Sequence, residues 1–105
     1  MEASALNEVL KDMKGEPFTD GATYGETIIQ ALTAQLPGDD RLSGKKKFDL
    51  FKLAMKTDEM MRGKDDVGFS TGDIETIKER VSAYPPLMVG RIWSMLDPVG
   101  AKGDK

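Results

Sequence analysis

The chain of 105 residues contains neither histidine nor cysteine. Without an imidazole or a thiol, no Ser–His or Cys–His pair can activate a nucleophile, and no imidazole can titrate near neutral pH. Zinc, copper and iron sites with nitrogen or sulfur ligands are excluded as well, so only cations with oxygen ligands remain. We expect no cofactor.

Long apolar runs and a basic leader are also missing. No stretch approaches the ~20 apolar residues that a transmembrane helix needs. Residues 1–8 have neither the basic region nor the apolar region of a secretory signal. With 39% apolar and 31% charged residues, the composition is typical of one soluble globular domain. We expect a cytoplasmic protein without membrane contact.

The charge is weakly acidic but uneven. A net charge of −3 argues against a dedicated nucleic-acid binder, which normally carries a cationic surplus. Residues 41–56 nevertheless hold six basic side chains against the single acid Asp49; they are Arg41, Lys45, Lys46, Lys47, Lys52 and Lys56.

Start and stop signals predict four helices. Thr23 with Glu26 and Ser70 with Asp73 are spaced as capping boxes, Ser43 is a good N-cap, and Pro86 suits a first helical position. The expected helices span about 24–36, 44–62, 71–83 and 86–96. Short connections favour a small all-α, four-helix bundle-like domain.

The longest expected helix carries a wide apolar band. Its members are Phe48, Phe51, Leu53, Ala54, Met55, Met60 and Met61. A band this wide predicts the central helix of a bundle, contacted on more than one side. It can be covered within one chain or across a dimer, so the sequence leaves the oligomeric state open.

The N-terminal region allows two interpretations. Lys14-Gly15 between apolar residues indicates a β-hairpin with arms Val9–Met13 and Glu16–Thr19, or Gly15 caps the end of an N-terminal helix. We favour the hairpin. The expected organisation is a flexible N-terminus (1–8), one helical domain (9–97) and a disordered tail (98–105).

Motifs for chemistry fail when tested. The segment 38–46 lacks the glycine spacing and the Ser/Thr of a phosphate-binding P-loop. Asp65-Asp66 with Ser70, Thr71 and Asp73 could hold a cation loosely, but a solvated loop and helix cap is favoured. No catalytic residues and no metal ligands are assigned, and we expect a protein that is not an enzyme.

Two surfaces are candidates for partner binding. Lys45, Lys46 and Lys47 lie in the first turn of the longest helix, where the macrodipole disfavours cations. They form either an anion site with the free amides after Ser43 or a solvated basic turn. Lys52 and Lys56 extend this basic face.

The second candidate surface lies around the last helix. It consists of Tyr84, Met88, Arg91 and Trp93, residue types that interfaces favour, although Trp93 alternatively belongs to the core. Gly90 costs about 1 kcal/mol in a helix interior relative to alanine. We expect it to permit close approach to the longest helix.

Two stretches resemble small proteins of tailed bacteriophages and prophages, mostly without an assigned role. They are residues 42–56 (LSGKKKFDLFKLAMK) and 77–93 (IKERVSAYPPLMVGRIW). The resemblance covers about residues 9–97, and Thr57 to Gly68 departs from the pattern. It carries helix-bundle patterns and no catalytic or ligand residues.

Three functions follow from these observations. The first is a non-catalytic phage accessory protein that binds a phage structural protein, in virion assembly, or a host protein, in the host bacterial cytoplasm. The alternative is a small nucleic-acid-binding regulator that uses the Lys45–Lys56 basic face. The third, an enzyme with an oxygen-ligated metal, predicts that metal addition changes the melting temperature.

Overall fold

The computed structural model describes residues 3–18, 21–64 and 68–97. They form four α-helices, α1 (Tyr24–Thr33), α2 (Gly44–Met61), α3 (Thr71–Val81) and α4 (Pro86–Leu96). Two short 3-10 helices accompany them, η1 (Ala3–Asn7) and η2 (Asp39–Arg41). Within these ranges β structure is limited to two isolated bridges. The prediction of a mostly helical, bundle-like domain is confirmed.

Local capping explains where the helices begin. The Thr23 hydroxyl accepts a hydrogen bond from the Glu26 amide at 3.1 Å, and the Glu26 carboxylate accepts one from the Thr23 amide at 3.0 Å. Ser70 and Asp73 repeat this capping box before α3. Ser43 caps α2 with its hydroxyl. Each cap satisfies amides that the helix leaves unpaired, so these starts agree with the sequence prediction.

The first helix ends earlier than expected. It was predicted to run to residue 36, but α1 ends at Thr33 and Ala34 is already extended. The side chain of Arg80 on α3 accounts for this end, because it binds the carbonyls of Ala31 and Ala34. A side chain 46 or more residues away therefore performs the C-terminal capping.

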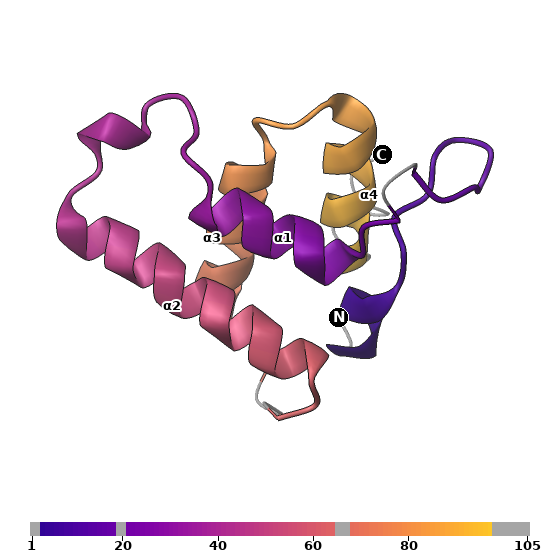
Figure 1. Cartoon of the computed structure of the whole chain (residues 1–105), viewed down its shortest axis with the longest axis horizontal. Coiled ribbons are helices and arrows are strands. Elements are labelled where there is room, and N and C mark those ends of the chain that lie inside the picture. Colours follow the sequence, from indigo (N-terminus) through magenta and orange to yellow (C-terminus); the bar gives the residue numbers. More distant parts are fainter. Residues whose placement is uncertain (1–2, 19–20, 65–67, 98–105) are drawn as a thin grey trace.

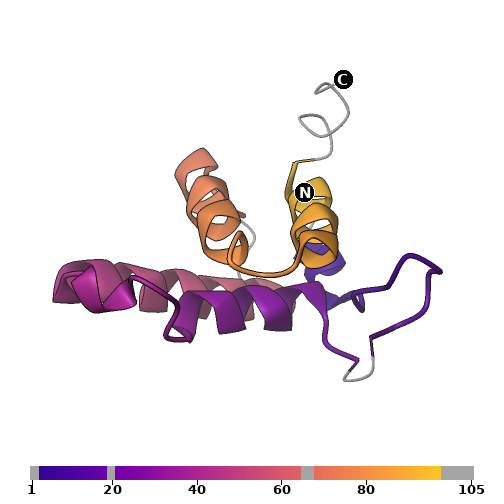
Figure 2. The same cartoon turned by 90° about the horizontal axis from the view of Figure 1, so that it is seen from above.

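The helices lie in two layers. Figure 1 shows α1 beside α2, and Figure 2 shows α3 and α4 together in a second layer over this pair. The pair α1–α2 makes the most extensive contact, and α1 also contacts α3, which contacts α4. The 3-10 helix η1 packs against both α1 and α2.

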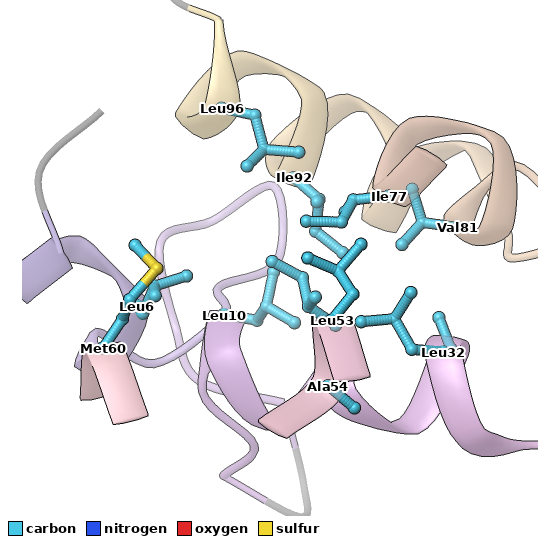
Figure 3. Packing of buried hydrophobic residues seen from close by; sticks show 12 residues of the cluster. Leu6, Leu10, Leu32, Leu53, Ala54, Met60, Ile77, Val81, Ile92 and Leu96 are labelled. Carbon is cyan, nitrogen blue, oxygen red and sulfur yellow. The ribbon is translucent and has the colours of Figure 1, made fainter. Parts of the chain in front are cut away.

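The core lies between the layers. Figure 3 shows side chains of α3 and α4 directed toward Leu10, Leu32 and Leu53. The buried apolar residues are Leu6, Leu10, Ile28, Ala31, Leu32, Leu53, Ala54, Met60, Ile77, Val81, Ile92 and Leu96. Leu6 is fully buried, so the packed domain includes η1. It therefore begins before residue 9, which was its expected first residue. The expected tail, residues 98–105, lies outside the described residues.

The long helix α2 is buried on one face only. The expectation of a central helix contacted on more than one side is wrong. Leu53, Ala54 and Met60 face the core, whereas Phe48 and Phe51 are 57% and 50% exposed. Two apolar faces were read as one band, because the pattern gives hydrophobicity around the helix but not which face finds a partner.

The segment before α1 forms a tight turn. The Asp12 amide donates to the Glu16 carbonyl at 2.8 Å, and Lys11 bridges to Pro17 in antiparallel fashion. Gly15 has φ +84°, a left-handed conformation that favours glycine. This arrangement is closer to the favoured hairpin than to a helix ending at Gly15.

Candidate protein-binding surfaces

Three of the five candidate lysines of α2 lie beside carboxylates of the same chain. The ammonium groups of Lys45 and Lys52 are 3.3 Å and 3.6 Å from the Asp49 carboxylate. Lys56 is 3.1 Å from Asp73. The hydrogen bond from Lys45 lowers the pKa of Asp49 below its usual value. The predicted basic face is therefore partly neutralised.

The remaining two lysines, Lys46 and Lys47, are exposed in the first turn of α2. The Lys46 amide donates to the Ser43 hydroxyl at 3.1 Å, so this amide serves the helix cap. Among the described residues, neither side chain forms an ion pair. The solvated basic turn describes them better than an anion site.

An exposed apolar stripe on α2 was not predicted from the sequence. Phe48, Phe51 and Met55 are 57%, 50% and 49% exposed, and the two phenyl rings stack with centroids 6.3 Å apart. The spacings of three and four residues place all three on one helix face. The available signal was the position of Leu53 and Met60, which the helical periodicity places on the opposite side of α2 from this stripe.

The candidates around α4 are brought together only in part. Tyr84 and Met88 are half-buried against the core. Trp93 is 39% exposed, and the Lys78 ammonium lies 5.2 Å from its ring centroid. A cation at this distance favours the ring face, so Trp93 lies at the edge of the core and is partly accessible.

Arg91 stabilises the N-terminal turn. Its guanidinium donates to the Lys11 carbonyl at 3.1 Å and to the Asp12 carbonyl at 2.7 Å. The Asp12 carboxylate in turn accepts hydrogen bonds from the amides of Lys14 and Glu16. The turn is thus attached to α4 across about 80 residues of sequence.

An open groove of about 790 Å³ lies between this turn and α4. Met13, Tyr24, Leu87 and Met95 contribute to its lining, and Met13 is 81% exposed at its edge. Burial raises the pKa of Tyr24, so its hydroxyl stays protonated at neutral pH and can donate a hydrogen bond.

Gly90 also lines the groove. A Cβ atom at this position would meet no heavy atom within 4 Å. The expectation that Gly90 lets α4 approach the long helix is wrong, because its α-carbon faces open space. This glycine lowers helix stability by about 1 kcal/mol relative to alanine, and no close contact within the described chain compensates for that loss.

A buried ion pair that the sequence pattern does not predict joins Arg80 of α3 to Asp39 of η2. Arg80 and Asp39 are 9% and 8% exposed, and two hydrogen bonds of 2.7 Å and 3.0 Å join guanidinium and carboxylate. The Asp39 carboxylate also accepts from the Leu36 amide at 2.7 Å. The Arg80 hydrogen bond, with that of Leu36, lowers the pKa of Asp39.

The hydrogen bonds of the Arg80 guanidinium stabilise the fold. They join it to Asp39 and to the carbonyls at the end of α1, so the pair fixes the loop between α1 and α2. No short sequence motif signals it, because the two residues are 41 positions apart.

Other possible sites add no functional group. Asp65 and Asp66 of the considered cation loop lie outside the described residues, and Asp73 caps α3 and binds Lys56. In the described ranges no cluster of three or more acidic residues could hold a metal ion. None of the helices described is both long and apolar enough for a membrane span.

Comparison with known proteins gives no relative. No protein-family model, no curated protein and no solved structure matches this chain.

Proposed function

We propose that this protein has no catalytic activity and acts by binding another protein in the groove between α4 and the N-terminal turn. The observation that carries the proposal is Gly90, which lies in the middle of α4 and lines this groove. Its missing side chain leaves space that no other part of the described chain uses. A partner helix or strand can approach the α4 backbone closely at this point.

The groove has the composition of a binding site. Leu87, Met95 and Met13 offer apolar surface, and methionine adapts its shape to a partner at low cost. The Tyr24 hydroxyl and the Arg91 charge add polar groups that can orient the partner. Arg91 also holds the turn in place, which reduces the entropy lost on binding.

The absence of catalysis is supported by the side-chain chemistry. The sequence has no histidine or cysteine. The carboxyl groups with shifted pKa values, Asp39, Asp49 and Asp73, are all shifted downward. They stay ionised at neutral pH and are engaged with cations or amides, which does not suit a general acid.

The resemblance to small phage and prophage proteins suggests the class of partner. We propose a phage structural protein during virion assembly, or a host protein in the bacterial cytoplasm. Nucleic-acid binding through Lys45–Lys56 has less support, because Lys45, Lys52 and Lys56 face carboxylates of their own chain.

The test is affinity purification of the tagged protein from a phage-infected bacterial lysate, with identification by mass spectrometry. Gly90→Leu fills the groove, and we expect it to lose a protein that the wild type retains. Gly72→Leu, on the exposed side of α3, is the matched control and should retain it. Equal recovery with Gly90→Leu refutes the groove, and recovery of nucleic acid instead favours the alternative.

A further inference from the structure

The exposed stripe of α2 has the spacing of a helix-pairing seam. Phe48, Phe51 and Met55 recur at intervals of three and four residues, as at the a and d positions of a heptad. In Figure 1 this helix runs along one side of the molecule, with α1 beside it. The stripe lies opposite the buried residues Leu53 and Met60, and it is not part of the groove proposed above.

The charges of α2 are reversed relative to its own dipole. Lys45 begins a basic first turn that contains no acid, although the positive end of the macrodipole lies there. Asp58 and Glu59 lie near the negative end. Both placements are unfavourable toward the dipole, and within the chain only the exposed ion pairs Lys45–Asp49 and Asp58–Arg62 offset them. Beside an antiparallel copy of α2, each becomes favourable, because the lysines then flank the acidic end of the second helix.

We propose that α2 packs antiparallel against α2 of a second copy, about a two-fold axis near Phe51. When Phe48 lies opposite Met55 of the second copy, Lys45 comes within about one residue rise, 1.5 Å, of Glu59 along the axis. Symmetry makes every such contact occur twice. In this arrangement α2 of the second copy covers the exposed faces of Phe48 and Phe51.

Lys52 is next to Phe51 and therefore also lies close to the two-fold axis. The ammonium groups of Lys52 from the two copies would repel each other there. The structure moderates this repulsion. The Lys52 ammonium lies 3.6 Å from the Asp49 carboxylate and 5.1 Å from the Phe48 ring centroid. Both interactions move the charge along α2 toward Phe48 and Asp49 and so away from the two-fold axis, and the apolar stem of Lys52 remains available for packing.

This dimer goes beyond the proposed function and does not depend on it. The groove belongs to α4 and the N-terminal turn, which Figure 1 places on the side away from α2. A symmetric dimer therefore presents two grooves, and two linked sites bind a repetitive partner more tightly than one.

The test is sedimentation equilibrium of the purified full chain from micromolar to near-millimolar concentration. We expect a monomer–dimer equilibrium with a Kd of about 1–100 µM, as for a small interface. Phe51→Asp should be monomeric throughout and folded by circular dichroism, with only a small fall in melting temperature, because this side chain is half exposed in the monomer and loses its stacking on Phe48. A wild type that stays monomeric overturns the proposal and leaves the stripe to a different partner.

A charge exchange tests the antiparallel arrangement. Lys45→Glu and Glu59→Lys should each raise the dimer Kd about tenfold. Each improves the match to the helix dipole; Lys45→Glu also breaks the exposed Lys45–Asp49 ion pair, a small loss, and circular dichroism should show that both variants stay folded. The double variant should restore the wild-type Kd within about threefold. Lys14→Glu, an equal charge change on the N-terminal turn, should have no effect. Failure of the double variant to recover, or a dimer that persists in Phe51→Asp, overturns the proposal.

Discussion

Replacing Arg80 with alanine should cause the largest loss of stability among the polar substitutions considered for this protein. The guanidinium donates four hydrogen bonds of 2.7–3.0 Å, two to the Asp39 carboxylate and one each to the carbonyls of Ala31 and Ala34. Removal leaves a carboxylate and two helix-terminal carbonyls without these partners. Breaking a buried ion pair from one side costs about 3–5 kcal/mol.

We expect the lower end of this range. Two open pockets adjoin Arg80, so water can enter after truncation and replace part of the lost hydrogen bonding. A loss of about 3 kcal/mol is a large part of the 5–15 kcal/mol typical of a domain. For a chain of this size it should lower Tm by at least about 12 °C.

The assay is urea and thermal unfolding followed by circular dichroism at neutral pH. Arg80→Lys retains the charge but not the fork that binds both carboxylate oxygens, so its stability should lie between wild type and Arg80→Ala. Arg91→Ala is a matched control that removes an arginine with two backbone hydrogen bonds and should cost only about 1 kcal/mol. A loss below about 1 kcal/mol for Arg80→Ala, at unchanged m-value, would refute the reasoning.

Three further predictions concern packing, capping and pH. Gly25→Ala places a methyl group against the Met61 thioether and should destabilise by about 1–3 kcal/mol; in thermal unfolding, Met61→Ala should relieve most of that loss, and additive losses would contradict the contact. Ser70→Ala removes the cap of α3 and should cost about 1 kcal/mol in urea unfolding, whereas no change would show that the cap contributes nothing. Burial raises the pKa of Asp73, but hydrogen bonds from Ser70 and Lys56 bring it below its ordinary value, and the Lys45 hydrogen bond lowers that of Asp49. Because these groups have lower pKa values folded than unfolded, stability should be complete above pH ~5 and fall as pH drops through the folded values. A Tm that is flat from pH 6 to pH 3 would contradict this.

The helix starts were predictable from sequence because capping is local. Thr23 and Glu26, like Ser70 and Asp73, are three residues apart, so their hydrogen bonds involve only neighbours in the sequence. Pro86 fixes the start of α4 for a similar local reason. The end of α1 was predicted less well, because it depends on Arg80, which lies on another helix.

The candidate site was predicted only in part. Sequence patterns identified α4 as an interaction element, and its groove contains one of the four residues named there, Arg91. They did not reveal the exposure of Phe48, because an aromatic residue at helical spacing is assigned to the core by its hydrophobicity. They also assigned Gly90 to a contact inside the chain, which the structure does not contain.

The sequence by itself determined the four described α-helices, their starts and the absence of histidine and cysteine chemistry, since these depend on residue identity and on neighbours within one turn. Only the tertiary structure decided which of the two apolar faces of α2 is buried, that Arg80 reaches Asp39, and that a groove lies along α4 beside the N-terminal turn. The physical reason is that these features are contacts between different helices and loops, with separations of 41 residues for Asp39 and Arg80 and 80 residues for Lys11 and Arg91. Local propensities do not specify which segments come into contact; the packing of the helix layers determines this.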